Sequence, residues 1–199
     1  MCIRDRFSFK KKLDAKEILF PLNKHLLSSI YELRETTLDD SRRPNQSVDT
    51  VFDESAALVY FLVCSPVKLA KLPSSVETLL LSALKGMVIA HLPGREKDDA
   101  QQFIENRFDA YYSDIEGGYN EAEICSKYLD FIGVIDHGNE IIQNFSYTSF
   151  IDTLFMDSMI IMANAKKNFK VIYRPLSKDD WASMSAQVKQ ALSEHKKSK

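Results

Sequence analysis

The sequence predicts an all-α fold, a single multi-helix bundle of about six to eight helices with at most one short strand pair. Apolar residues recur at three- and four-residue intervals along most of the 199-residue chain, the spacing that lines one face of a helix. Capping motifs, prolines and glycines separate these stretches, as expected for helix boundaries. The chain contains six Gly and six Pro, too few for a fold made of many short strands and turns.

The first helix is predicted over residues 14–37, where Leu and Ile recur with helical spacing. Pro21 interrupts this pattern, and we expect it either to kink the helix or to mark the first turn of a second one. Residues 38–49 are polar and have no apolar period, which indicates an exposed loop.

The next two segments are strongly apolar. Residues 56–64 form an uninterrupted apolar run, and we favour a helix there because Asp53 can cap it and Pro66 can end it. A Ser-x-x-Glu capping box opens residues 74–92, which stop at a Pro-Gly pair. This second helix is apolar nearly all round, so we expect it at the centre of the domain.

Three further helices are predicted over residues 96–115, 120–132 and 141–165. The first has the clearest amphipathic pattern, and the acidic residues at its start suit the helix dipole. A capping box that begins at Asn120 opens the second. The third is apolar over more than half of its circumference, and we expect it to share the core with residues 74–92.

The C-terminal part of the chain predicts a short strand and a last helix. Residues Phe169 to Tyr173 favour a strand, and Val48 to Phe52 is the partner that we expect for it. A final capping box opens a helix that ends at about residue 194.

The domain organisation is one helical domain over residues 7–194. Residues 1–6 resemble a translated sequencing adapter, and we expect them to be non-native. We expect residues 195–199 to form a flexible basic tail.

Charge is segregated along the sequence, although the formal net charge is only -2 and the pI is about 6.1. Residues 96–157 carry fourteen acidic and three basic side chains, whereas residues 158–199 carry nine basic and three acidic ones. We therefore expect an acidic interaction surface around residues 96–140. The expected partner is a protein with a basic surface, or a second copy of the chain. The acidic balance argues against nucleic-acid binding.

Neither secretion nor a membrane span is predicted. The basic N-terminal residues are not followed by the long apolar run of a signal peptide. The most apolar stretches contain charges that are costly in a bilayer, namely Lys85 in residues 78–92, and Asp152 and Asp157 in residues 141–163. The three cysteines are too few and too scattered for a disulfide scaffold or a zinc motif. We expect a cytoplasmic protein.

The sequence favours a non-enzymatic binding or adaptor module without a cofactor or metal, because it contains no nucleophile elbow, phosphate-binding loop or paired-histidine motif. One alternative is a helical metal-dependent hydrolase with a site assembled from dispersed Asp, Glu and His residues, among them His91, Asp136 and His137. Another is a small-molecule sensor with an apolar pocket beside the Met- and Phe-rich stripe of residues 145–162. Converging acids and histidines would favour the enzyme, and a cavity of at least ~300 Å³ would favour the sensor.

Arg107 is the only arginine within residues 96–157, and it shares a helical stripe with four aromatic residues, Phe103, Phe108, Tyr111 and Tyr112. Such an arginine can stack on a ring, bind an anionic group with two hydrogen bonds, or pair with an acid of its own or a neighbouring helix. Arg and Tyr are enriched in protein-binding hot spots. The predicted partner-binding residues are Phe103, Arg107, Tyr111 and Tyr112.

Overall fold

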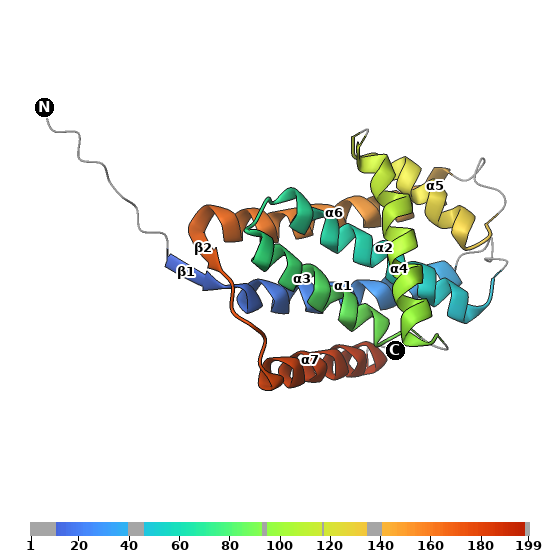
Figure 1. Ribbon diagram of the computed structural model, residues 1–199. Helices are drawn as coiled ribbons and strands as arrows, with labels where there is room; N and C mark the ends of the chain where they lie inside the picture. Colours follow the sequence, from blue (N-terminus) through green and yellow to red (C-terminus); the bar gives the residue numbers. More distant parts are fainter. Residues whose placement is uncertain (1–10, 40–45, 93–94, 117, 135–140, 198–199) are drawn as a thin grey trace, which may run out of the picture.

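The computed structural model describes residues 11–39, 46–92, 95–116, 118–134 and 141–197. These residues form seven helices and two short strands, which confirms the predicted all-α fold (Figure 1). In chain order the elements are β1 (Lys11–Asp14), α1 (Ala15–Leu38), α2 (Val48–Leu69), α3 (Ser74–Ile89), α4 (Lys97–Glu116), α5 (Glu121–Phe131), α6 (Ile141–Asn168), β2 (Phe169–Ile172) and α7 (Lys178–Lys197). The adapter-like residues 1–6 lie outside the described residues.

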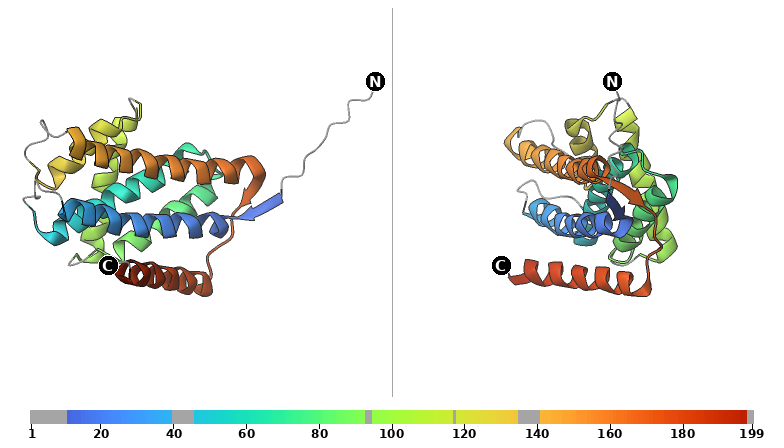
Figure 2. Two further views of the ribbon diagram at one scale, coloured as in Figure 1. Left: turned by 180° about the vertical axis from the view of Figure 1, so that it is seen from behind. Right: turned by 90° about the vertical axis from the view of Figure 1, so that its left-hand side faces the viewer.

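Helix α2 lies at the centre of the bundle, with α1, α3, α4, α5 and α6 packed around it (Figures 1 and 2). Every residue from Val51 to Val67 is buried. The expectation that residues 74–92 occupy the centre is wrong. Helix α3 buries only one side, and its other side is exposed to solvent. The central helix was harder to identify because polar residues at its start lower its apparent hydrophobicity.

Among the described residues, α2 is the one helix that is long and apolar enough to cross a bilayer. Within the bundle, 94% of its most apolar stretch is buried. The core helix of a globular domain has the same properties.

The strand pair exists, but its predicted partner is wrong. Strand β2 pairs in parallel with β1, and Val171 lies opposite Leu13. Residues Val48 to Phe52 instead form the start of α2, where the Ser47 hydroxyl accepts a hydrogen bond from the backbone N–H of Thr50. The β-branched residues there favour a strand by composition, but the Ser47 cap stabilises the first helical turn.

The strand pair joins the start of the chain's first helix to the end of its longest one. Strand β1 leads directly into α1, which Asp14 caps by accepting a hydrogen bond from the backbone N–H of Lys16. Strand β2 follows α6 without a loop. The parallel pairing therefore holds the N-terminal end of α1 beside the C-terminal end of α6.

Several predicted helix boundaries differ from the observed ones. Asp53 is not a cap, because α2 begins at Val48 and continues through Pro66 to Leu69. Helix α3 has Pro73 at its N-cap position without a side-chain cap. Pro21 lies inside a single helix, α1, and does not divide it.

Two predicted caps are confirmed. The Asn120 side chain accepts hydrogen bonds from the backbone N–H groups of Ala122 and Glu123 at the start of α5. Ser177 and Asp180 form a reciprocal capping box at the start of α7.

Helix α7 packs along α1, on the side away from α6 (Figure 2). Met184 is fully buried in this contact, and Lys16 forms an ion pair with Asp180 at 3.3 Å. The helix extends to Lys197, a few residues beyond its predicted end.

The central position of α2 predicts different effects for two leucines of this helix. Replacing Leu58, which is fully buried, with Ala should lower the free energy of unfolding by about 2–5 kcal/mol, because it leaves a cavity in the core. Leu69→Ala is the matched control: the side chain is 41% exposed, and the loss should stay below about 0.5 kcal/mol. Urea unfolding monitored by circular dichroism measures both. Equal losses would contradict the placement of α2.

Candidate functional site

Helix α2 carries three consecutive buried polar residues, Asp53, Glu54 and Ser55, with exposed fractions of 3%, 2% and 0%. Buried polar groups need hydrogen-bond partners, and buried charges need opposite charges. Each of the three finds its partner on a different segment: Arg95 before α4, Arg107 within α4, and Tyr128 within α5. These contacts attach α4 and α5 to the central helix.

Arg107 and Glu54 form a bidentate ion pair. The Arg107 Nε donates to both carboxylate oxygens of Glu54, at 2.8 and 3.0 Å, and Nη2 donates to Oε1 at 2.7 Å. Burial raises the pKa of the Glu54 carboxyl, while the Arg107 guanidinium acts in the opposite direction. Such bidentate pairs fix geometry as well as charge.

The second pair joins buried Asp53 to the partly exposed Arg95, whose Nε donates to Oδ2 of Asp53. Among the described residues, the other carboxylate oxygen of Asp53 is buried without a hydrogen-bond partner. Burial raises the pKa of Asp53, and its bond to Arg95 opposes this rise. The Arg95 guanidinium carbon lies 4.1 Å from the ring centroid of Phe103.

A hydroxyl cluster completes the buried polar contacts of α2. The Tyr128 hydroxyl lies 2.8 Å from both Ser55 Oγ on α2 and Thr37 Oγ1 on α1. Ser55 and Thr37 donate their own protons to the backbone carbonyls of Val51 and Leu33. The cluster therefore links α1, α2 and α5 inside the core.

The four predicted partner-binding residues all belong to α4, but they differ in how far they are buried. Arg107 pairs with Glu54, an acid of a neighbouring helix, and its guanidinium carbon lies 3.7 Å from the Phe131 ring centroid and 5.4 Å from that of Phe103. Tyr111 is fully buried in the core. Phe103 and Tyr112 are half-buried. Tyr111 therefore supports the site from inside, and Phe103 and Tyr112 remain accessible to a partner.

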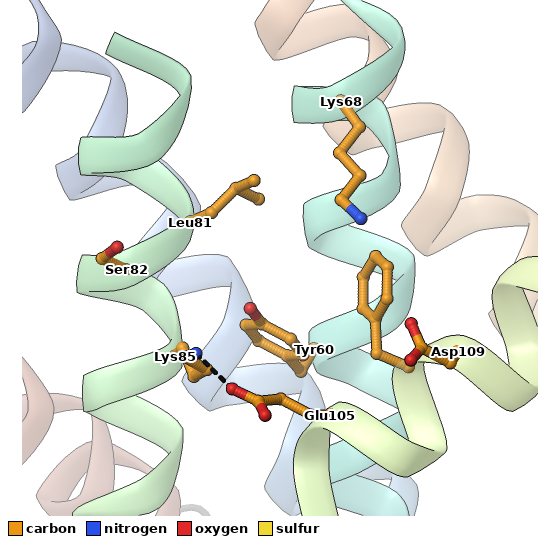
Figure 3. Close-up of a pocket in the computed structure, with 8 residues that line it drawn as sticks. Tyr60, Lys68, Leu81, Ser82, Lys85, Glu105 and Asp109 are labelled. Atoms are coloured by element: carbon orange, nitrogen blue, oxygen red, sulfur yellow. Dashed lines mark hydrogen bonds and ion pairs between the residues drawn. The ribbon is translucent and has the colours of Figure 1, made fainter. Parts of the chain in front are cut away.

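A cleft of about 300 Å³ opens between α2, α3 and α4 (Figure 3). Lys85 on α3 donates to Glu105 on α4 at 2.7 Å. The Lys68 ammonium lies 4.4 Å from the Phe108 ring centroid and 4.8 Å from that of Tyr112, and these two rings stack on each other. The remaining lining residues are Tyr60, Leu81, Ser82 and Asp109. The cleft is therefore charged and aromatic, and it holds lysine side chains by ion pairing and by cation–π contact.

The outer sides of α4 and α5 carry acidic side chains, which we call the α4–α5 acidic surface. Its exposed members are Glu96, Asp98, Asp99, Asp109, Glu121, Glu123 and Asp130. The basic residues of the same region are arranged differently. The Arg107 guanidinium bonds to Glu54 of the core, and the Lys127 ammonium donates to the carbonyl of Ala110 at 2.6 Å. Over the same described residues, Arg95 and Lys97 are the exposed basic residues, and Arg95 also pairs with Asp53.

Of His91, Asp136 and His137, the residues considered for a metal site, His91 is the one that the structure describes. His91 Nδ1 lies 2.6 Å from the backbone carbonyl of Met87. Asp136 and His137 lie outside the described residues. Across the described ranges, no group of three or more His, Cys, Asp or Glu side chains is arranged to hold a metal ion. The hydrolase alternative stays a prediction. The sensor alternative stays one too: a hollow of about 410 Å³ beside residues 146–157 of α6 meets its volume criterion, but its lining is largely polar.

Comparisons with protein-family models, with curated proteins and with solved structures found no match for this chain. The structure itself shows an all-α domain in which two arginines neutralise the two buried acids of the central helix, Asp53 and Glu54.

Sequence reasoning missed Glu54, Arg95 and Tyr128, which form the buried polar contacts of this site. One sequence signal could have indicated them. An Asp-Glu-Ser triplet immediately before a long apolar run lies on a helix that buries all its faces, and its acids then require arginine partners from elsewhere in the chain.

Two ion pairs that involve α4 residues should contribute unequally to the stability of the fold. Arg107→Met keeps an apolar stem but leaves the Glu54 carboxylate buried and unpaired, so unfolding free energy should fall by about 3–5 kcal/mol. Lys85→Met removes a more exposed ion pair with Glu105, so the loss should stay below about 1 kcal/mol. Chemical unfolding at neutral pH measures both.

The same substitution predicts a pH dependence. Without Arg107, burial raises the pKa of Glu54 further, and the native protein takes up a proton that the unfolded chain does not hold. A raised native pKa of a carboxyl favours the folded state at low pH. The stability gap between wild type and Arg107→Met should therefore narrow as the pH falls from about 7 toward the ordinary glutamate pKa of about 4.3. A constant gap would show that Glu54 is not the unpaired group.

Proposed function

We propose that this protein is a non-enzymatic binding or adaptor module whose α4–α5 acidic surface binds a basic segment of a partner protein. The main support for the proposal is that the basic and the acidic side chains of this region point in opposite directions. Arg95 and Arg107 face inward to Asp53 and Glu54. The acidic side chains of α4 and α5 face outward.

The ion pairs with α2 leave the exposed surface of α4 and α5 more negative. Helices α4 and α5 together contain nine acidic and three basic residues. Because Arg107 neutralises an acid of α2, it does not offset the acids of its own helix. A surface with one predominant sign of charge attracts ligands of the opposite sign and raises their association rate.

The packing of α4 also suits a binding surface. The Arg107–Glu54 pair, the Arg95–Asp53 pair just before α4, and the Phe103 and Phe131 rings hold the helix in one position against α2. A rigid surface loses little conformational entropy when a partner binds.

The adjacent cleft offers a position for one basic side chain of the partner. Asp109 belongs both to the cleft lining and to the acidic surface (Figure 3). The stacked rings of Phe108 and Tyr112 already contact the Lys68 ammonium, and Glu105 already binds Lys85. An incoming lysine or arginine would therefore pair with Asp109, and it would compete with Lys68 and Lys85 for the rings and for Glu105.

Neutralising the acidic surface should weaken binding to a basic peptide. We expect the triple variant Asp98→Asn, Asp99→Asn and Asp109→Asn to bind a fluorescently labelled oligolysine peptide about tenfold more weakly than wild type. The reason is that each surface ion pair contributes about 0.2–1 kcal/mol. Fluorescence anisotropy at about 0.15 M salt, where the Debye length is about 8 Å, measures the affinity, and oligoglutamate serves as the non-binding peptide.

The matched control removes the same number of charges elsewhere. Glu17→Gln, Asp49→Asn and Asp152→Asn likewise neutralise two exposed acids in first helical turns and one within a helix. This variant should bind oligolysine within about twofold of wild type, since exposed charges beyond a Debye length are screened. Equal weakening in both variants would reject a specific acidic surface.

A second copy of the chain is the other expected partner, because exposed lysines gather near β2 and the start of α7. Among them are Lys167, Lys170 and Lys178. If this region binds the acidic surface of another copy, the average mass by light scattering should fall as salt increases, because salt screens exposed charges. A monomer at both low and high salt, in concentrated protein, would exclude self-association.

A further inference from the structure

A polar groove lies between α1 and α6, which run beside each other (Figure 2). It has a volume of about 410 Å³. Beyond His25 and Asp157 it continues into a second hollow of about 390 Å³, bordered by Pro21, Lys24 and Ile160. None of the residues that line the α2–α3–α4 cleft takes part.

Hydroxyl groups of α1 present acceptor oxygens to this groove. Ser28 Oγ donates to the backbone carbonyls of Lys24 and His25, at 3.0 and 3.1 Å. Thr36 Oγ1 donates to the carbonyl of Glu32 at 2.9 Å. Because each hydroxyl has one proton and this proton is already engaged, the remaining lone pairs can only accept hydrogen bonds.

Two further polar residues line the groove. Ser29 is only 5% exposed and lies in its wall. The His25 Nε2 atom is buried. Burial lowers the pKa of His25, although Asp157, a hydrogen bond to the backbone of Leu154, and Glu32 act in the opposite direction. In its neutral form an imidazole has one acceptor nitrogen.

The charged residues of the groove are predominantly acidic. Glu32 projects from α1 and Asp157 from α6, and both are exposed. Lys24 borders the second hollow, toward the apolar end of the groove. Phe150 and Leu154 contribute apolar surface between the polar groups.

We propose that the α1–α6 groove binds a small aliphatic amine. An ammonium group has three donors and no acceptor, which complements carboxylates, hydroxyl oxygens and a neutral imidazole. The alkyl chain of such a ligand would lie on Phe150 and Leu154. Anionic ligands are disfavoured by Glu32 and Asp157. The volume is at the lower end of the range typical of small-molecule sites and suits a chain of a few carbons.

The test is a titration with putrescine monitored by heteronuclear NMR, with butanediol as the uncharged analogue of equal chain length. We expect saturable shifts confined to residues of α1 and α6 with putrescine, and none with butanediol. The double variant Glu32→Gln and Asp157→Asn should bind putrescine at least about tenfold more weakly, because two charge-assisted hydrogen bonds are lost. Ser29→Ala should weaken binding by about threefold.

Asp152→Asn is the matched control, because Asp152 is an exposed acid of the same helix that does not line the groove. Its putrescine affinity should stay within about twofold of wild type. The Asp98, Asp99 and Asp109 triple variant should also keep its putrescine affinity, and the groove variants should keep their oligolysine affinity.

The two proposals therefore fail separately. If putrescine produces no saturable shifts, or if its affinity falls in the α4 triple variant and not in the groove variants, the amine site is rejected. Neither result changes the oligolysine experiment on the acidic surface.

Discussion

The burial of two acidic residues in the central helix α2 constrains the rest of this structure. Helix α2 is enclosed by five other helices, yet it begins with acids that cannot lie in an apolar core without opposite charges. Arg95 and Arg107 supply these charges, and Tyr128 supplies a hydroxyl for Ser55. The positions of α4 and α5 are thus determined by hydrogen-bond geometry as well as by apolar contact. Removing either arginine would affect the central helix and the surface helix together.

This constraint also determines the character of the outer surface. Because Arg107 faces inward, Lys97 is the remaining basic residue of α4 that can offset the exposed acids of this helix, so internal neutralisation contributes to external acidity. The aromatic rings of Phe103 and Phe131 contact the guanidinium groups and keep them oriented toward α2. The charged cleft and the α1–α6 groove are lined by different residues on different helices. One fold can therefore present two separate surfaces that carry acidic side chains.

Most of the helices could be predicted from the sequence, because helix formation follows local spacing and capping. Asn120 and the Ser177–Asp180 pair cap helices as expected. Prediction failed where a distant segment decided the outcome. The partner of β2 is β1 rather than Val48 to Phe52, and this pairing spans nearly the whole chain. Local composition contains no information about such a contact. Asp53, expected as a cap, became a buried ion-pair partner for the same reason.

The same distinction between local and distant contacts applies to the candidate site. Sequence alone identified Arg107 and its aromatic neighbours, because a lone arginine in an acidic segment is visible in the chain itself. It also determined the helical class and the segregation of charge, since both follow from residue types and their spacing. Only the tertiary structure decided which helix is central, that Arg107 binds Glu54, and that Tyr111 is buried. These facts depend on which faces of distant helices meet. The burial that makes a polar group require a partner exists only after the helices have packed.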